Sequence, residues 1–172
     1  MHWLIDGYNV IRRDADLRAA ESAGLEAGRA ALIRLVAAAA RGTPDRFTVV
    51  FDGAHPRGRD PVPGQVEVLF SRPPRKADDV LVELARRPGP GGAVVVSSDR
   101  AVQSAARRAK CAVVDAESFL ARLDADRAPR DEDEKDEGDD DGRPRPKRGN
   151  PRRVSRKARD TRRALDRLGR RE

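Results

Sequence analysis

The sequence predicts an α/β domain in which helices cover both faces of a central, mainly parallel β-sheet. In residues 1–124, short runs of β-branched and aromatic residues alternate with longer stretches whose apolar residues recur at helical spacing. One short run, residues 94–96, is apolar throughout, which is typical of a strand covered on both faces. Strands separated by helices pair in parallel through right-handed crossovers, so the alternation predicts a doubly wound fold.

The first half of the domain begins with a strand over residues 3–5 that ends at Asp6. A helix is expected over residues 25–40. A Gly-Thr-Pro sequence at residues 42–44 ends it, because glycine suits the position after a helix and proline cannot continue one. The next strand covers residues 47–51 and ends at Asp52, and a loop rich in proline, glycine and arginine follows.

The second half of the domain opens with a strand over residues 66–70. Its place in the sheet stays open, because no helix separates it from the strand before it. Helices and strands then alternate to the end of the domain, over residues 76–87, 94–96, 99–109, 112–114 and 117–123. We expect Trp3 and Phe119 to lie in the core.

The charge divides the chain into three segments. The 172 residues carry a formal net charge of +7, of which residues 1–124 contribute +3, as in an ordinary domain, residues 125–142 contribute −7 and residues 143–172 contribute +11. Such charge blocks without apolar periodicity are typical of disorder, so we expect a disordered acidic-then-basic linker over residues 125–153. Apolar residues at helical spacing then predict a basic amphipathic helix in the tail, residues 154–172.

Composition excludes several classes of protein. One cysteine and two histidines rule out a disulfide framework and argue against a zinc site. No apolar run approaches the ~20 residues that span a bilayer, and the N-terminus lacks the basic and apolar segments of a signal peptide. There is no Walker A loop, and the glycines at 89–92 lack the spacing of a dinucleotide fingerprint. We therefore expect a cytoplasmic protein with no membrane partner and no dinucleotide cofactor.

Aspartates stand where three of the predicted strands end, at Asp6, Asp52 and Asp99. Parallel strands end at one edge of the sheet, where ligands of such folds bind, so these carboxylates point toward one edge. Asp78 and Asp79 add carboxylates from a helix start, and the helical wheel places Asp78 beside the apolar face and Asp79 toward solvent. Neighbouring carboxylates need a cation, and Mg²⁺ or Mn²⁺ suits oxygen ligands. The sequence predicts such a metal site.

Each aspartate also has a purely structural interpretation. Asp-Gly is an ordinary turn dipeptide, Asp99 could serve as a helix N-cap in the same way as Asp115, and Asp78 and Asp79 could act only as favourable first-turn charges. Taken singly, each residue fits the structural interpretation. The convergence of Asp6, Asp78 and Asp99 on one edge favours the metal site.

Four motifs follow one another along the chain in a characteristic order. They are Asp6-Gly7-Tyr8-Asn9, Phe51-Asp52-Gly53, Ala77-Asp78-Asp79 and Ser97-Ser98-Asp99. In this order they resemble the NYN domain of the PIN-like nuclease superfamily, specifically the bacterial YacP-like group, from residue 2 to about residue 124, and the Asp-Gly-Tyr-Asn opening is the most specific of them. The resemblance implies a PIN-like three-layer fold, a metal-dependent endoribonuclease activity and, for the YacP-like group, cleavage of mRNA on the ribosome.

The resemblance also implies roles for individual residues. Asp6, Asp78 and Asp99 match the acidic catalytic and metal-binding set, and Asn9 matches a supporting polar residue. Asp79 falls at a second acidic position, and Asp52 is a further ligand candidate. The charged tail matches no motif of the family.

Basic residues supply candidates for RNA binding. Arg72, Arg75 and Lys76 flank the acidic site and would hold the RNA backbone, although Arg75 and Lys76 fit a solvated helix start equally well. Tyr8 is the one aromatic residue placed to stack on a base, with core packing as the alternative. A basic tail gains affinity from counterion release; its candidates are Arg152, Arg153, Arg156 and Lys157.

Three functions fit these observations. The first is a Mg²⁺- or Mn²⁺-dependent endoribonuclease whose products are a 5′-phosphate and a 3′-hydroxyl. The second is a non-catalytic RNA- or ribosome-binding module of the same fold. The third, a phosphohydrolase of small metabolites, is disfavoured because the chain has no nucleophilic Asp-x-Asp motif and because a basic tail suits polyanions better.

Overall fold

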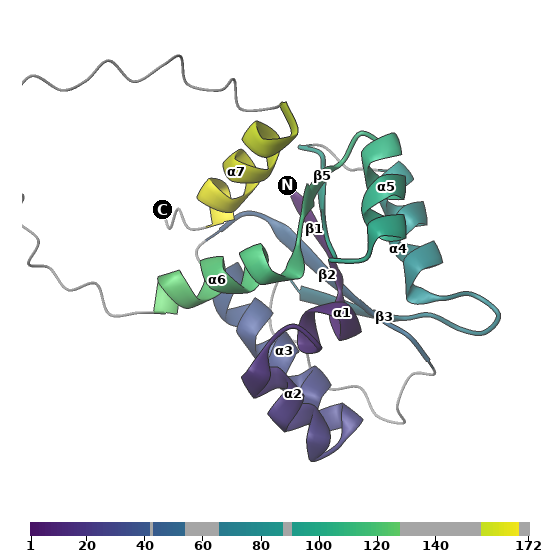
Figure 1. Ribbon diagram of the computed structural model, residues 1–172, viewed down its shortest axis with the longest axis vertical. Helices are drawn as coiled ribbons and strands as arrows, with labels where there is room; N and C mark the ends of the chain where they lie inside the picture. Colours follow the sequence, from purple (N-terminus) through teal and green to yellow (C-terminus); the bar gives the residue numbers. More distant parts are fainter. Residues whose placement is uncertain (42, 54–65, 88–90, 128–155, 169–172) are drawn as a thin grey trace, which may run out of the picture.

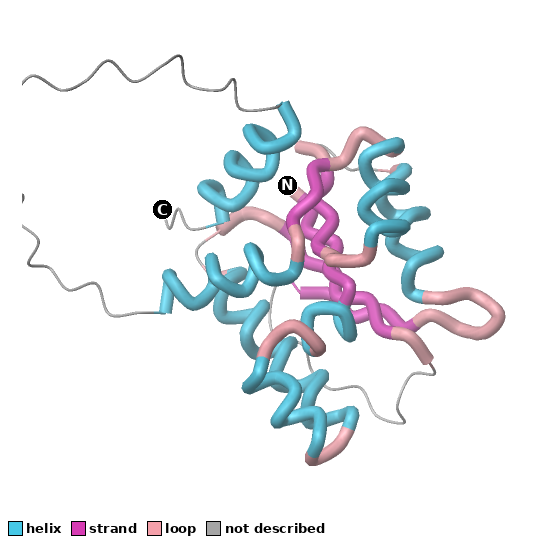
Figure 2. Tube along the Cα trace, in the orientation of Figure 1, coloured by secondary structure: helices cyan, strands magenta, loops and turns pink. Residues whose placement is uncertain are grey.

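The protein is built on a five-stranded sheet whose strands are all parallel, as the computed structural model shows (Figures 1 and 2). The structure describes residues 1–41, 43–53, 66–87, 91–127 and 156–168. The strands lie in the order β3-β2-β1-β4-β5. Their bounds are β1 His2–Asp6, β2 Arg46–Phe51, β3 Val66–Phe70, β4 Ala93–Val96 and β5 Ala112–Val114. The predicted α/β fold with a parallel sheet is confirmed.

The central strands β2, β1 and β4 are buried almost throughout, which explains why their sequences are nearly continuous apolar runs. β3 lies at the edge beside β2, with Phe51 opposite Phe70, and its side chains are more exposed. The register also places Ile5 of β1 opposite Val49 and Val96. The C-terminal ends of β1, β2 and β4 therefore reach the same edge of the sheet.

The described residues form seven helices, which pack as layers on the two faces of the sheet (Figure 1). Alternate strand residues point to opposite faces, so Ile5 belongs to the core on the face covered by α1, α3, α6 and α7, whereas Leu4 belongs to the core on the face covered by α4 and α5. The helices are α1 Gly7–Ile11, α2 Ala15–Ser22, α3 Leu25–Ala40, α4 Ala77–Arg86, α5 Arg100–Arg108, α6 Ala116–Arg127 and α7 Arg156–Leu168. No helix among the described residues is long and apolar enough to span a membrane.

The helices α1 and α2 were not predicted from the sequence. α1 has five residues, and α2 buries Leu17 alone, so neither has a repeating apolar pattern. Asp14 caps α2 by accepting a hydrogen bond from the Leu17 backbone N–H at 2.8 Å. Gly28 of α3 lets α2 approach closely, because a Cβ there would lie 2.8 Å from Cβ of Glu21.

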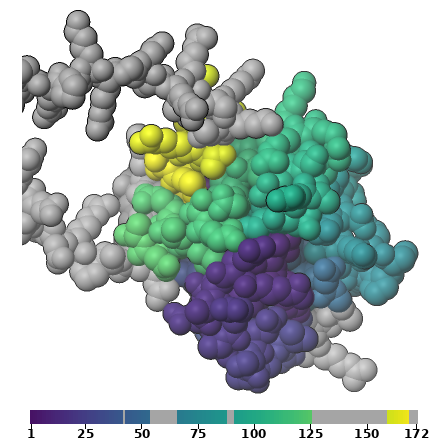
Figure 3. All heavy atoms as spheres, in the orientation of Figure 1, coloured from purple at the N-terminus to yellow at the C-terminus, as the bar shows by residue number. Residues whose placement is uncertain are grey.

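The helix α7, which lies beyond the predicted domain boundary at residue 124, packs against the domain. Ala164 and Leu168 are buried, Thr161 Oγ1 donates a hydrogen bond to the Val113 carbonyl at 2.7 Å, and Arg122 Nε donates one to the Leu165 carbonyl at 3.1 Å. In the space-filling view α7 lies directly against α6 (Figure 3). The apolar spacing predicts the helix, but it does not reveal a partner more than 40 residues away.

The predicted linker lies largely outside the described residues. Its first three residues, 125–127, belong to α6, which continues past the predicted boundary. Residues 128–155, which include the acidic run 131–141, and residues 169–172 lie outside the described part of the chain.

Trp3 occupies the core, as predicted, between Phe47 and Phe119 at ring-centroid distances of 6.1 and 6.0 Å. Its indole Nε1–H donates to Oδ2 of Asp45 at 3.1 Å. Asp45 is completely buried, just before β2 begins, and also contacts the amino group of Met1 at 2.7 Å and Arg167 Nε of α7 at 3.4 Å. This buried carboxylate therefore links β1, β2 and α7 at the edge of the sheet where the strands begin.

Candidate active site at the carboxyl edge of the sheet

Asp6 is the last residue of β1 and the N-cap of α1, and it is only 8% exposed. Its Oδ1 accepts a hydrogen bond from the Asn9 backbone N–H at 3.3 Å, and its Oδ2 accepts one from Ser97 Oγ at 2.9 Å. Burial raises the pKa of Asp6 to about 6; the two hydrogen bonds oppose that rise, and the nearby Asp78 and Asp52 add to it. Within the described residues, Asp6 is a buried carboxylate whose donors are all uncharged.

Asn9 and Ser97 hold the ends of β1 and β4 together. Asn9 Oδ1 accepts a hydrogen bond from the Ser98 backbone N–H at 2.7 Å. Ser97 is fully buried, and its Oγ, besides donating to Asp6, accepts from the Asp99 backbone N–H at 3.1 Å. Gln103 Nε2 of α5 donates to the Ser97 carbonyl at 2.7 Å. The Asn9 side chain thus fixes the Ser98 backbone beside Asp6, and its supporting role in the site stays a prediction.

Asp99 and Asp52 both cap helices at this edge. Asp99 Oδ1 accepts hydrogen bonds from the backbone N–H groups of Ala101 and Val102 at 2.6 and 3.1 Å, so it is the N-cap of α5. Asp52 Oδ1 accepts from the Ala77 backbone N–H at the start of α4, at 2.6 Å, and from the hydroxyl of Ser71, directly after β3, at 3.0 Å. Asp99 therefore acts as a helix N-cap, which is the structural interpretation given in the sequence analysis.

Asp78 and Asp79 occupy different environments, as the helical wheel predicted. Asp78 is half-buried, whereas Asp79 is exposed and its Oδ2 accepts from the Lys76 backbone N–H at 3.0 Å. Burial is the main cause of a raised pKa at Asp78, and neighbouring carboxylates add to it. In decreasing order these neighbours are Asp99, Asp52 and Asp79, while Lys76 acts in the opposite direction. The predicted carboxylates thus interact across one edge of the sheet.

The side chains at this edge are of the right chemical type to bind a divalent metal ion, but the described ones do not surround a common point. Carboxylate oxygens are the ligands that Mg²⁺ and Mn²⁺ prefer, and the repulsion felt by Asp78 is what a cation would relieve. Within the described ranges, however, no three Asp, Glu, His or Cys side chains are close enough together to hold one ion. The structure brings Asp6, Asp52, Asp78 and Asp99 to one edge without gathering three of them around a point.

The predicted RNA-binding residues of the domain lie on its surface near α4. Arg72, Arg75 and Lys76 are exposed, and Arg75 pairs with Glu83 of α4. Tyr8 is partly buried, with its ring edge-on to Phe51 at a centroid distance of 5.2 Å. Among the predicted tail residues, Arg152 and Arg153 lie outside the described residues, and Arg156 and Lys157 begin α7, where their side chains are not described.

Glu117 is a further carboxylate at this edge that the sequence analysis missed. It lies in the first turn of α6, where it accepts a hydrogen bond from Ser98 Oγ at 2.5 Å and pairs with Arg13 at 3.0 Å between Nη1 and Oε1. The hydrogen bond from Ser98 is the main cause of its lowered pKa. The available signal was its position three residues after β5, which repeats the strand-then-acid pattern of the other sites.

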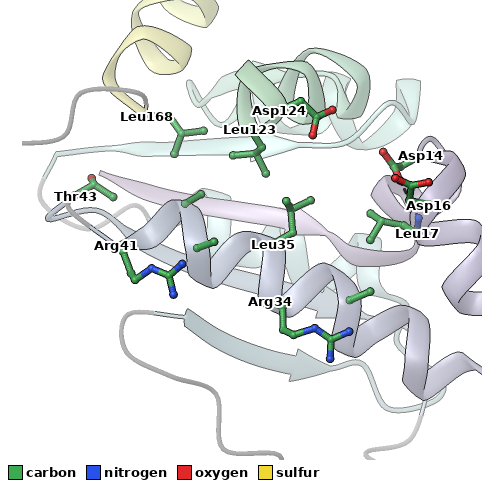
Figure 4. A pocket seen from close by; sticks show the side chains of 13 residues that line it. Asp14, Asp16, Leu17, Arg34, Leu35, Arg41, Thr43, Leu123, Asp124 and Leu168 are labelled. Atoms are coloured by element: carbon green, nitrogen blue, oxygen red, sulfur yellow. Dashed lines mark hydrogen bonds between the residues drawn. The ribbon is translucent and has the colours of Figure 1, made fainter. Parts of the chain in front are cut away.

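A hollow of about 720 Å³ lies elsewhere, between α2, α3 and α6 (Figure 4). Its apolar lining includes Leu17, Leu35, Leu123 and Leu168, with charged residues of both signs around it. None of the candidate metal ligands lines it. The candidate site is therefore an open edge of the sheet, separate from this hollow.

Known proteins resemble most of the chain. Residues 3–163 match the family model of the YacP-like NYN domain. The crystal structure of Rae1 (YacP) from Bacillus subtilis superimposes with a TM-score of 0.62 at 26% sequence identity, covering 73% of this chain and 74% of that one. A mutant of the same protein gives a TM-score of 0.62 at 27% identity, covering 73% and 75%. No curated protein matches the sequence.

Proposed function

Because this chain belongs to the YacP-like NYN domain family, whose members are RNA-acting nucleases, we propose that it is a metal-dependent endoribonuclease that hydrolyses RNA phosphodiester bonds at the carboxyl edge of its sheet. The observation that carries the proposal is the hydrogen bond between Asp6 and Ser97. It joins the ends of β1 and β4. The helix that follows β1 lies on one face of the sheet and the helix that follows β4 lies on the other. Ligands of open α/β sheets bind at such a switch point.

We propose that Asp6, Asp78 and Asp99 hold Mg²⁺ or Mn²⁺, with Asp79 and Asp52 as additional ligands. Such a cation, when bound, lowers the pKa of a coordinated water and neutralises phosphate oxygens. The remaining work belongs to the chain itself. Ser97 and the Asn9 backbone N–H orient the Asp6 carboxylate, and the Asn9 side chain fixes the Ser98 backbone beside it; Lys76 and Arg72 would bind the RNA backbone.

We further propose that the RNA is mRNA engaged with the ribosome. The chain has a net charge of +7, and α7 exposes Arg159, Arg162 and Arg163 while its apolar residues face the domain. Cationic surfaces of this kind favour RNA because bound phosphates release counterions.

A non-catalytic RNA-binding module is the alternative, and one observation favours it. Asp52 and Asp99 already have structural roles as helix caps, and among the described residues no three candidate ligands surround a common point. Such a module would bind RNA through its cationic surfaces and leave the phosphodiester intact.

Cleavage of an end-labelled single-stranded RNA tests the proposal, with Mg²⁺ or Mn²⁺ and then with excess EDTA. We expect cleavage with metal, none with EDTA, and none for Asp6→Asn or Asp78→Asn. Asp14→Asn is the matched control, because Asp14 is also a helix cap but serves α2, away from the proposed ligands, and Asn is an equally good cap. Wild-type protein that binds RNA without metal-dependent cleavage would establish the binding module instead.

A further inference from the structure

The six aromatic residues of the chain form two separate groups of three. Trp3, Phe47 and Phe119 are fully buried, and the Trp3 ring packs against the other two in the core. Tyr8 and Phe70 flank Phe51 at the C-terminal ends of β1, β2 and β3, at centroid distances of 5.2 and 5.7 Å, and both are only partly buried. In a chain that is 3% aromatic, half of the rings lie at the edge that carries the candidate active site.

Among the described residues, only the edge group has arginines over its rings. In the described part of the chain, the Arg12 guanidinium carbon lies 5.9 Å from the centroid of Tyr8, and that of Arg29 lies 5.4 Å from the centroid of Phe70. Arg12 is exposed and pairs with no carboxylate within the described ranges, whereas its neighbour Arg13 pairs with Glu117. The Arg12 side chain can therefore move from the ring at little cost, since an exposed cation–π contact is worth only about 0.5–1 kcal/mol.

The backbone fixes the position of the Tyr8 ring beside the acidic edge. Gly7 precedes Tyr8, and a Cβ at Gly7 would lie 2.2 Å from Cε1 of Phe51. The absence of that atom lets α1 approach Phe51, against which Tyr8 then packs. Tyr8 is two residues from Asp6, so a nucleotide that reaches the Asp6 carboxylate has its base within reach of this ring.

We propose that Tyr8 and Arg12 form a subsite for one unpaired base of single-stranded RNA, stacked on the Tyr8 ring and covered by the Arg12 guanidinium. The proposal rests on the proposed function, because it assumes that RNA approaches the acidic edge. Proteins that bind single-stranded RNA stack splayed bases on aromatic rings and arginine planes. A base within a duplex is paired and stacked and cannot enter such a subsite. The subsite therefore selects single-stranded RNA.

The test measures binding of a fluorescently labelled single-stranded oligoribonucleotide in EDTA, so that cleavage does not interfere. We expect Tyr8→Leu, which keeps apolar packing on Phe51, to weaken binding about tenfold, in line with the loss of one stacked base. Tyr8→Phe keeps the ring and is expected to bind as the wild type does. Arg12→Gln is expected to weaken binding more than Arg13→Gln, which removes the same charge one residue away. Thermal unfolding of each variant shows that it is folded.

A series of oligoribonucleotides, each with one abasic position, identifies the base. At one position the abasic RNA should bind wild-type protein about tenfold more weakly and bind Tyr8→Leu no more weakly than the intact RNA does. Duplex RNA should bind both proteins equally. Equal binding of single-stranded RNA by folded Tyr8→Leu and wild type, or a loss at Tyr8→Leu that is the same for intact and all abasic RNAs, would overturn the subsite. Cleavage by the wild type would still stand in that case, so the two proposals fail separately.

Discussion

Two buried aspartates at opposite edges of the sheet show how this fold treats negative charge. Asp45, where β2 begins, is completely buried and contacts two cations, the Met1 amino group and Arg167, as well as the Trp3 indole. Asp6, where β1 ends, is nearly as buried but receives hydrogen bonds only from a serine hydroxyl and a backbone N–H in the described structure. Both carboxylates are satisfied, but among the described residues only Asp45 has cations as partners.

The difference separates a structural carboxylate from a candidate functional one. A buried charge is costly unless it is paired, so a fold selected for stability alone would supply a cation to each. At the edge where the strands begin, the Met1 amino group and Arg167 supply this positive charge to Asp45. At the edge where they end, burial raises the pKa of Asp6, and further carboxylates nearby add to that rise. The Mg²⁺ or Mn²⁺ ion proposed above would supply the cation at this edge.

The largest expected loss of stability follows from Asp45→Asn. This change leaves the Met1 amino group and Arg167 without their common anion and disrupts a fully buried contact, so the free energy of unfolding should fall by roughly 3 kcal/mol. Urea denaturation at pH 7.5 measures it. A loss below about 0.5 kcal/mol, which is typical of a surface substitution, would contradict a structural role for Asp45.

The opposite sign is expected for Asp6→Asn. Because the pKa of Asp6 is about 6 in the folded protein against an ordinary value of 3.8, the folded state binds the proton more tightly, and stability falls as the pH rises from about 4 to about 6. Without metal, the variant should match the wild type near pH 4 and exceed it at pH 7.5 by up to about 3 kcal/mol. Urea denaturation across this pH range tests the sign, and a variant less stable than the wild type at pH 7.5 refutes it.

Substitutions of Asp99 separate its role as a helix cap from its role as a ligand. Asp99→Ala removes the hydrogen bonds to the start of α5 and should cost about 1 kcal/mol, whereas Asp99→Asn keeps a good cap and should cost a few tenths. Both variants should lose metal-dependent cleavage of RNA. If Asp99→Asn cleaves as well as the wild type, Asp99 is a cap and nothing more.

A small effect, on stability alone, is expected for Arg167→Gln. Its side chain is half exposed, and Asp45 keeps the Met1 amino group and the Trp3 indole, so the loss should stay below about 1 kcal/mol. Comparing its denaturation midpoint with that of Asp45→Asn shows how much stability is lost when the cation is removed and how much when the carboxylate is removed. A loss as large as that of Asp45→Asn would show that docking of α7 depends on this ion pair.

The sheet could be predicted because its signal is local. The apolar runs at β1, β2 and β4 follow from burial on both faces, and the strand boundaries agree with the structure to within one residue. The short helices α1 and α2 escaped prediction because α1 has only five residues and α2 buries only Leu17, so neither carries a periodic pattern. The docking of α7 depends on contacts such as Thr161 to Val113, and nothing local encodes a contact across 48 residues.

The candidate site could be predicted only as far as topology determines it. Parallel strands must end at one edge, which is why Asp6, Asp52 and Asp99 lie there. Which hydrogen bonds each carboxylate makes depends on details of loop geometry that the sequence pattern does not contain. The cap that Asp52 provides to α4 and the contact of Ser97 with Asp6 were therefore not foreseen. The assignment of Asp6, Asp78 and Asp99 as metal ligands stays a prediction.

Thermal unfolding with increasing MnCl₂ tests most directly whether an external cation completes the acidic edge. A ligand that binds only the folded state raises the unfolding temperature. The wild type and Asp45→Asn should both show a rise that grows with MnCl₂ concentration, and Asp6→Asn and Asp78→Asn should lose most of it. No rise in the wild type, or an equal rise in Asp6→Asn, would contradict the metal site.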